Sequence, residues 1–173
     1  MRLFTAVDFT PEIKDKLYGI INQMKPRTER ANFTRKENLH LTLVFIGEKN
    51  QAEYNDIVRR LSGVKFEPFK IEFENHGRFR NIHWIGIKHS DKLAELQKRI
   101  ADTLEIKADF DYTPHITLAR EVIPKNDFKL EVPTMEMKVD RFNLMKSERI
   151  NGILKYTAVT SHQASAQTPA GNC

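Results

Sequence analysis

Two tetrapeptides of one pattern, His40–Leu43 (HLTL) and His115–Leu118 (HITL), constrain the fold of this chain more than any other feature. Polar and apolar residues alternate in both, as they do in a β-strand with one buried face. Each histidine therefore shares a face with the threonine two residues later, roughly 6–7 Å along the strand, while the apolar residues face the core. If the two strands lie side by side, two imidazoles and two hydroxyls face one groove that a phosphate could bridge.

The doubling of this motif carries more weight than either copy alone. A single His-x-Thr pattern in a strand is common and says little about function. Two copies in a chain of 173 residues are much less expected by accident. Each copy also follows a turn signal, Glu37-Asn38 before the first and Tyr112-Thr113-Pro114 before the second. We interpret the pair as a candidate functional site.

A length of 173 residues fits one compact domain or two small lobes that share a core. Because 40% of the residues are hydrophobic, the chain can bury a sizeable core. No apolar run approaches the roughly 18 residues that a membrane-spanning helix needs, and the N-terminus resembles a first strand more than a signal peptide. The only cysteine is Cys173, so no disulfide can form within the chain, and we expect a cytoplasmic protein. A net charge of +5 favours an anionic partner without selecting one.

Further stretches accompany the two motifs: RLFTAV at residues 2–7, ENLHLTLVFIGE at 37–48, GRF at 77–79, HWIG at 83–86 and HITLAR at 115–120. With them the chain resembles the two-histidine (2H) phosphoesterase superfamily and, within it, the bacterial and archaeal RNA 2',3'-cyclic phosphodiesterases, also called 2'-5' RNA ligases. The resemblance covers about residues 1–160; one departure is Ala31-Asn32, where the family often has a tryptophan-valine pair. It implies an enzyme with a bilobal fold that opens a 2',3'-cyclic phosphate.

The order of expected elements predicts an α+β fold with two lobes. We expect two pseudo-symmetric antiparallel sheets, flanked by helices, around a central groove. Residues 1–161 would form this single bilobal domain and residues 162–173 a disordered tail, because the tail has no large apolar residue. The expected elements are strands at 2–8, 39–46, 69–73, 82–88, around 115, 136–145 and 153–161, helices at 11–24, 51–61 and from 91, and loops at 27–36 and 74–81.

Hydrolysis of a cyclic phosphodiester needs a base that takes a proton from water and an acid that protonates the leaving oxygen. Histidine suits both roles near neutral pH, so we predict that His40 and His115 are catalytic. Thr42, Thr117 and Arg120 would bind the phosphate oxygens. The residues alone leave open which histidine is the base. The resemblance implies that His115 is the base and His40 the acid, and that the O3' ester bond breaks to leave a 2'-phosphate.

A second basic and aromatic cluster lies at Arg78-Phe79-Arg80. Such a trio could stack an RNA base between arginines that bind phosphate, so Arg78 and Phe79 are candidate RNA contacts. An equally good interpretation is a hairpin tip whose phenylalanine packs under the sheet.

A metal site is the main competing interpretation of the two motifs. Zinc sites use three or four His, Cys, Asp or Glu ligands, and neither motif contains a cysteine or carboxylate, so we expect no metal and no cofactor. The expected partners are RNA or nucleotides with 2',3'-cyclic phosphate ends, with no membrane, and the expected state is a monomer. The resemblance leaves room for the reverse reaction, 2'-5' RNA ligation. The alternative is a non-catalytic nucleotide- or RNA-binding module that uses the same groove.

Overall fold

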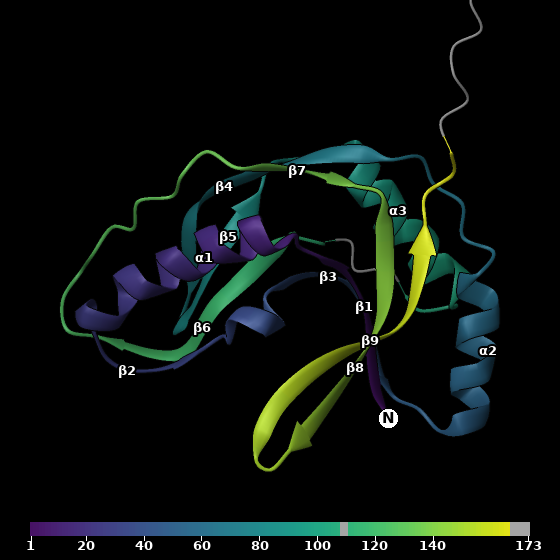
Figure 1. Ribbon diagram of the computed structural model, residues 1–173, viewed down its shortest axis with the longest axis horizontal. Coiled ribbons are helices and arrows are strands. Elements are labelled where there is room, and N and C mark those ends of the chain that lie inside the picture. Colours follow the sequence, from purple (N-terminus) through teal and green to yellow (C-terminus); the bar gives the residue numbers. More distant parts are fainter. Residues whose placement is uncertain (108–110, 167–173) are drawn as a thin grey trace, which may run out of the picture.

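The computed structural model describes residues 1–107 and 111–166, and this part of the chain forms two antiparallel sheets and three α-helices (Figure 1). The expected α+β fold with two antiparallel sheets is confirmed. The first sheet has the order β3-β1-β8-β9, with β1 at Arg2–Asp8, β3 at His40–Glu48, β8 at Arg141–Ile150 and β9 at Ile153–Gln163. The second has the order β2-β6-β5-β4-β7, with β2 at Thr28–Phe33, β4 at Phe69–Phe79, β5 at Ile82–Ile87, β6 at His115–Pro124 and β7 at Glu136–Val139.

The helices begin where the sequence predicts, because each has a side-chain N-cap. The Thr10 hydroxyl accepts the N–H of Ile13 at 3.3 Å, and Asn50 and Glu53 form a reciprocal capping box. Ser90 caps the last helix in the same way as Thr10. In the described part of the chain, no helix has the length and apolar character needed to cross a membrane. The helices are α1 (Pro11–Met24), α2 (Gln51–Leu61) and α3 (Asp91–Thr103), with short 3-10 helices η1 (Lys25–Arg27) and η2 (Lys36–Asn38).

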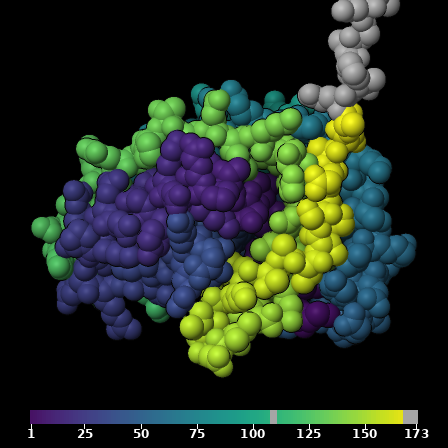
Figure 2. All heavy atoms as spheres, in the orientation of Figure 1, coloured from purple at the N-terminus to yellow at the C-terminus, as the bar shows by residue number. Residues whose placement is uncertain are grey.

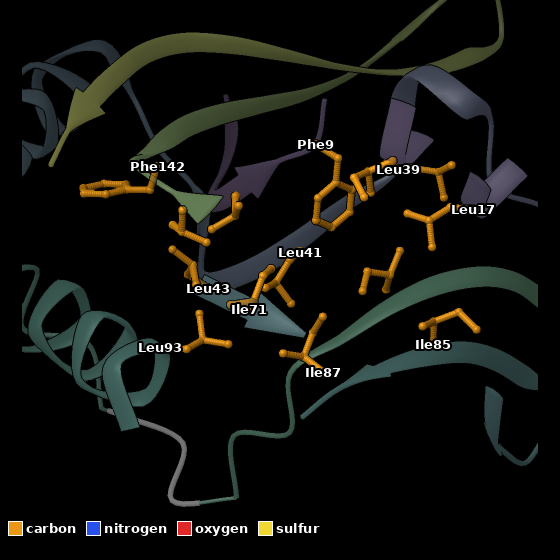
Figure 3. Close-up of a cluster of buried hydrophobic side chains, with 14 of the residues drawn as sticks. Phe9, Leu17, Leu39, Leu41, Leu43, Ile71, Ile85, Ile87, Leu93 and Phe142 are labelled. Carbon is orange, nitrogen blue, oxygen red and sulfur yellow. The ribbon is translucent and has the colours of Figure 1, made fainter. Parts of the chain in front are cut away.

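The apolar residues of both motifs lie in the core, as the alternation predicts. Leu41 and Leu43 project from β3 into a cluster of buried side chains that includes Ile85 of the second sheet (Figure 3). Ile116 and Leu118 of β6 are fully buried in the same cluster. Burial of such a side chain contributes about 1.5–3 kcal/mol. The core therefore fixes β3 and β6 so that the histidines and threonines occupy the opposite face.

The expected loop at 27–36 is wrong, because it contains strand β2, which pairs with β6 through Asn32 and Arg120. This strand is the edge of the second sheet and has one hydrogen-bonded neighbour. It is mostly polar and exposed, so it lacks the alternation that would reveal it.

The expected loop at 74–81 is also wrong. Strand β4 continues to Phe79 and turns into β5 through Arg80-Asn81, where Arg80 has a φ of 54°. An irregularity in pairing between Phe73 and His76 shifts the phase of the strand. The alternation of residue types along the sequence is therefore interrupted, although the strand itself is continuous.

The expected strand at 136–145 is two strands. The chain breaks pairing at Asp140, so β7 joins β4 of the second sheet while β8 joins β1 of the first. The β8–β9 hairpin then extends beyond the body of the molecule (Figures 1 and 2). Strand β9 ends at Gln163 rather than Ser161. The last part of the predicted disordered tail, 167–173, lies outside the described residues.

Candidate active site

A groove of about 700 Å³ lies where β3 of the first sheet contacts β6 of the second. His40 and Thr42 line it from β3, and His115, Thr117 and Arg120 line it from β6. The structure thus brings together all five residues that the sequence assigned to phosphate chemistry. They come from the two strands that the doubled motif predicted.

Two hydrogen bonds hold the main chain of the groove in place. The Tyr112 hydroxyl donates to the Thr42 carbonyl at 2.9 Å and so ties the segment before β6 to β3. Burial raises the pKa of Tyr112, which keeps this hydroxyl protonated as a donor. The Thr34 hydroxyl donates to the Thr117 carbonyl at 2.8 Å. The two threonines of the motifs are therefore each anchored through their carbonyl oxygens.

Hydrogen bonds and ring contacts fix the position of the His40 imidazole. Its Nδ1–H donates to the carbonyl of Asn38 at 2.7 Å, and its Nε2 lies 2.8 Å from the Thr42 hydroxyl oxygen. The rings of Phe4 and Tyr156 lie 5.0 and 5.1 Å from the imidazole, centroid to centroid. Because Nδ1 is bonded to a carbonyl, the neutral imidazole has its lone pair on Nε2. Nε2 is thus the nitrogen that can exchange a proton in the groove.

The charge state of His40 reflects opposing influences. Burial lowers its pKa, because an imidazolium ion is poorly solvated there. The hydrogen bond to Asn38 and the negative charge of Asp8 raise the pKa, whereas Lys14 and Arg120 lower it further. The net effect is a pKa below that of a free imidazole. The neutral form is favoured in the protein without a ligand.

His115 has the same main-chain partner but a different environment. Its Nδ1–H donates at 2.8 Å to the carbonyl of Thr113, two residues earlier, as His40 does to Asn38. Its side chain is exposed, and the ring of Trp84 lies 6.2 Å away, centroid to centroid. Both imidazoles are therefore oriented by the same kind of hydrogen bond, but His40 is half-buried whereas His115 is exposed. That difference makes the two halves of the site chemically unequal.

Asn38 is a site residue that the sequence did not reveal beyond marking a turn. It is buried, and its side-chain amide donates to the Leu154 carbonyl at 2.9 Å while accepting the Tyr156 N–H at 3.2 Å. Asn38 thereby joins η2 to β9, and its own carbonyl orients His40. These partners are more than a hundred residues away along the chain, so no local pattern could identify them.

The groove has a wall from the first sheet that the sequence also missed. Phe45 is 69% exposed and lines the groove, with its ring 6.3 Å from that of Phe4. Arg2 and Arg149 line the same wall. A groove wall with an exposed aromatic ring and guanidinium groups suits a planar, anionic ligand.

Arg78 and Phe79 do not line this groove. Arg78 lines a separate pocket of about 470 Å³ together with His83, and its guanidinium lies 4.0 Å from Asp127. Phe79 is 65% exposed, so it does not pack under the sheet, and the Arg80 guanidinium lies 5.4 Å from its ring centroid. As successive residues of a strand, Arg78 and Phe79 face opposite sides of β4.

The chemistry available in the groove follows from these side chains. Each imidazole can take up or release a proton at Nε2, and Arg120 and the threonine hydroxyls can donate hydrogen bonds to an anion. Across residues 1–107 and 111–166, no group of three or more His, Cys, Asp or Glu side chains is placed to hold a metal ion. The arrangement suits proton transfer on both sides of a bound phosphate.

Comparisons with known proteins identify the family, relatives and fold of this chain. The family model described as the 2'-5' RNA ligase superfamily matches residues 13–151. The chain is 36% identical to the RNA 2',3'-cyclic phosphodiesterase of Archaeoglobus fulgidus, covering 69% of this chain and 72% of that protein. It is 30% identical to the protein of that name from Thermotoga maritima, covering 85% and 87%. The crystal structure of E. coli LigT in apo form has a similar fold, with a TM-score of 0.86 and 22% identity over 95% of this chain and 98% of that one.

Proposed function

The chain belongs to the 2'-5' RNA ligase superfamily, and from this premise we propose that it is an RNA 2',3'-cyclic phosphodiesterase that hydrolyses RNA or nucleotide 2',3'-cyclic phosphates. Four relatives with that name, 30–36% identical to the chain, support the proposal. The observation that carries it is the pairing of His40 and His115 in one groove, each with Nδ1 bonded to a main-chain carbonyl.

The reaction needs one proton taken and one given. His115 takes a proton from water as the water oxygen forms a bond to phosphorus, and the bond from phosphorus to O3' breaks. His40 gives its proton to O3', so the product is a 2'-phosphate. Thr42, Thr117 and Arg120 donate hydrogen bonds to the non-bridging oxygens, where negative charge increases in the transition state. The roles of the two histidines and the choice of O3' follow what the resemblance implies.

The substrate itself prepares His40 for the acid role. Burial disfavours the imidazolium in the free protein, but a bound phosphate brings negative charge next to the ring. A negative charge close to an imidazole raises the pKa of the histidine, because it stabilises the imidazolium ion. His40 therefore gains its proton as the substrate binds, and the anion compensates for the lost solvation.

We assign the terminal base to the wall of the first sheet. Phe45 offers an exposed ring at the groove, and RNA bases commonly stack on such rings. The two reactive halves of the site are alike in side-chain type, so they do not by themselves choose between O2' and O3'. The position of the base on Phe45 makes that choice by fixing how the ribose lies.

Turnover of a nucleoside 2',3'-cyclic phosphate in the presence of a chelator tests the proposal, with the product identified by phosphorus NMR. We expect a 2'-phosphate, and we expect His40→Ala and His115→Ala each to lose about 10²–10⁴-fold in kcat/KM while remaining folded by circular dichroism. His89→Ala, at an exposed position outside the groove, is the matched control.

Each contrary result has a distinct meaning. Binding without turnover by the unmodified protein would support the non-catalytic binding module instead. Near-normal turnover by either histidine variant would overturn the mechanism. A predominant 3'-phosphate would reverse the orientation of the ribose, and rescue by added metal after chelation would show a metal requirement. Ligation would use the same bond changes with a 5'-hydroxyl in place of water: its oxygen forms a bond to phosphorus, the bond from phosphorus to O3' breaks, and a 2'-5' linkage results.

A further inference from the structure

The second sheet continues the groove surface away from His115. Trp84 of β5 pairs with Thr117 of β6 on one side and with Gly77 of β4 on the other. Residues directly opposite each other in antiparallel strands share a face. Because Thr117 lines the groove, Trp84 and Gly77 lie on the groove side of the sheet.

Trp84 lies against the backbone of Gly77. A Cβ atom at position 77 would be 2.1 Å from Cη2 of the indole and 2.4 Å from Cζ3, so only glycine leaves room for the ring. The inner side of the indole is therefore covered by β4, and the partly exposed side chain presents its other side outward. Its centroid is 6.2 Å from that of His115, so this aromatic surface begins next to the proposed active site.

Phe79 extends this surface. Pairing of β4 with β5 is regular from His76 to Phe79, so Phe79 shares the face of Gly77. Two strand spacings and two residues place it roughly 12 Å from Thr117. The Phe79 ring is 65% exposed, more than any other aromatic side chain of the second sheet among the described residues. A chain of a few nucleotides spans this distance.

The positive charges on this face lie to one side of the aromatic residues. Arg120 lines the groove, and the Arg80 guanidinium lies over the Phe79 ring at 5.4 Å from its centroid. Both lie toward the β4–β5 turn. Glu74 lies on the opposite side of Trp84, with its Oε2 3.6 Å from where a Cβ of Gly86 would be. A polyanion is therefore attracted along the side of the arginines.

We propose that this face binds the single-stranded RNA that precedes the cyclic end, with Trp84 and Phe79 as stacking surfaces and Arg80 as a phosphate contact. Aromatic side chains on an open sheet, flanked by cations, are a general solution for binding single strands. The inference rests on the proposed function and refines its substrate class to oligonucleotides. It keeps Phe79 as an RNA contact and leaves out Arg78, which faces the other side of β4.

The first test compares a cyclic mononucleotide with a short oligonucleotide that ends in a 2',3'-cyclic phosphate. We expect the ratio of their kcat/KM values to favour the oligonucleotide, and to fall about 5- to 150-fold in Phe79→Ala, the loss of one stacked base. The matched control is Phe45→Ala, an equally exposed phenylalanine of the first sheet, which should lower both values alike and preserve the ratio. A ratio near one in the unmodified protein, or one unaffected by Phe79→Ala, would overturn the inference.

The second test does not depend on turnover. Trp84 is the only tryptophan of the chain, so a base stacked on it should quench the fluorescence of the protein. We expect quenching by a short oligonucleotide without a cyclic phosphate, with affinity weakened in Phe79→Ala and a smaller salt dependence in Arg80→Ala. Quenching without turnover would reject the proposed function and keep the RNA surface. Turnover with no RNA-dependent quenching, or with affinity unchanged in Phe79→Ala, would do the opposite.

Discussion

The carbonyl oxygen of Asn38 lies 2.7 Å from Nδ1 of His40, and the side chain of the same asparagine is bonded to the main chain of β9. One residue thus orients an imidazole with its carbonyl and fixes its own position with its amide. Asn38 acts through His40 as a positioning residue.

Asn38→Ala should therefore weaken both the fold and the activity. It leaves the Leu154 carbonyl and the Tyr156 N–H without these partners, so we expect the free energy of unfolding to fall by about 1–3 kcal/mol. The kcat should fall more than KM rises, because the orientation of His40 is disturbed. Urea unfolding and steady-state kinetics measure both effects. Asn55→Ala, an exposed asparagine of α2, is the control, and equal behaviour of the two variants would contradict the assignment.

The lowered pKa of His40 predicts different pH profiles for the free and bound enzyme. If His40 is the acid, kcat/KM falls as pH rises through the pKa of free His40, which burial holds below 6.5. A bound phosphate raises that pKa, so the corresponding limb of kcat should lie at higher pH. The limbs give macroscopic values for the histidine pair. Coincident high-pH limbs for kcat and kcat/KM would contradict this account.

The two histidine roles are separable with an activated leaving group. A nucleoside p-nitrophenyl phosphodiester releases an anion that needs no proton, so loss of the acid should matter little. We expect His40→Ala to retain most of its activity toward this substrate, whereas His115→Ala, without the base, remains impaired. Release of p-nitrophenolate is followed by absorbance. The reverse pattern would exchange the two roles.

Gly77→Ala should disturb the indole of Trp84. The added Cβ would lie 2.1 Å from a ring atom, so the ring must move, and we expect a loss of about 1–3 kcal/mol in the free energy of unfolding together with changed tryptophan fluorescence. Gly19→Ala is the matched control, since no atom outside its own helix lies within 4 Å and helical alanine is favoured by about 0.5–1 kcal/mol. Similar stability of the two variants would show that Trp84 can adapt.

His76 should make the fold sensitive to acid. Its Nε2 lies 2.8 Å from Nδ1 of His83, and burial, with the charges of His83 and Arg78, lowers its pKa from 6.5 to about 4. The folded state thus binds this proton more weakly than the unfolded state, and stability falls as pH drops from 6.5 toward 4. In His76→Phe the melting temperature should depend less on pH across this window. His89→Phe, at an exposed position, should behave like the unmodified protein; equal pH dependence in His76→Phe would refute the effect.

The predictable parts of this molecule are those encoded locally. Alternation at His40–Leu43 and the caps at Thr10 and Ser90 depend on residues a few positions apart. These local patterns were enough to predict the strands of the two motifs and the helices. Strand β2 and the break at Asp140 depend on pairing with distant strands, so they have no local signal. Likewise, the sequence suggested the two histidines and their phosphate-binding neighbours, but the ring of Tyr156 reaches His40 only through the fold.

Strand β1 lies between β3 and β8, so the first sheet joins the N-terminal strand to the late strands β8 and β9, whereas the second sheet is built from β2 and β4 to β7. A ribosome adds about 5–20 residues per second, and on the order of 100 residues separate β3 from β8. During synthesis, β8 therefore becomes available to pair with β1 roughly 5–20 s after β3 does. The second sheet can form during this interval. The C-terminal hairpin then completes the surroundings of His40. A chain that stalls before residue 141 would leave one edge of β1 open to pairing with other nascent chains.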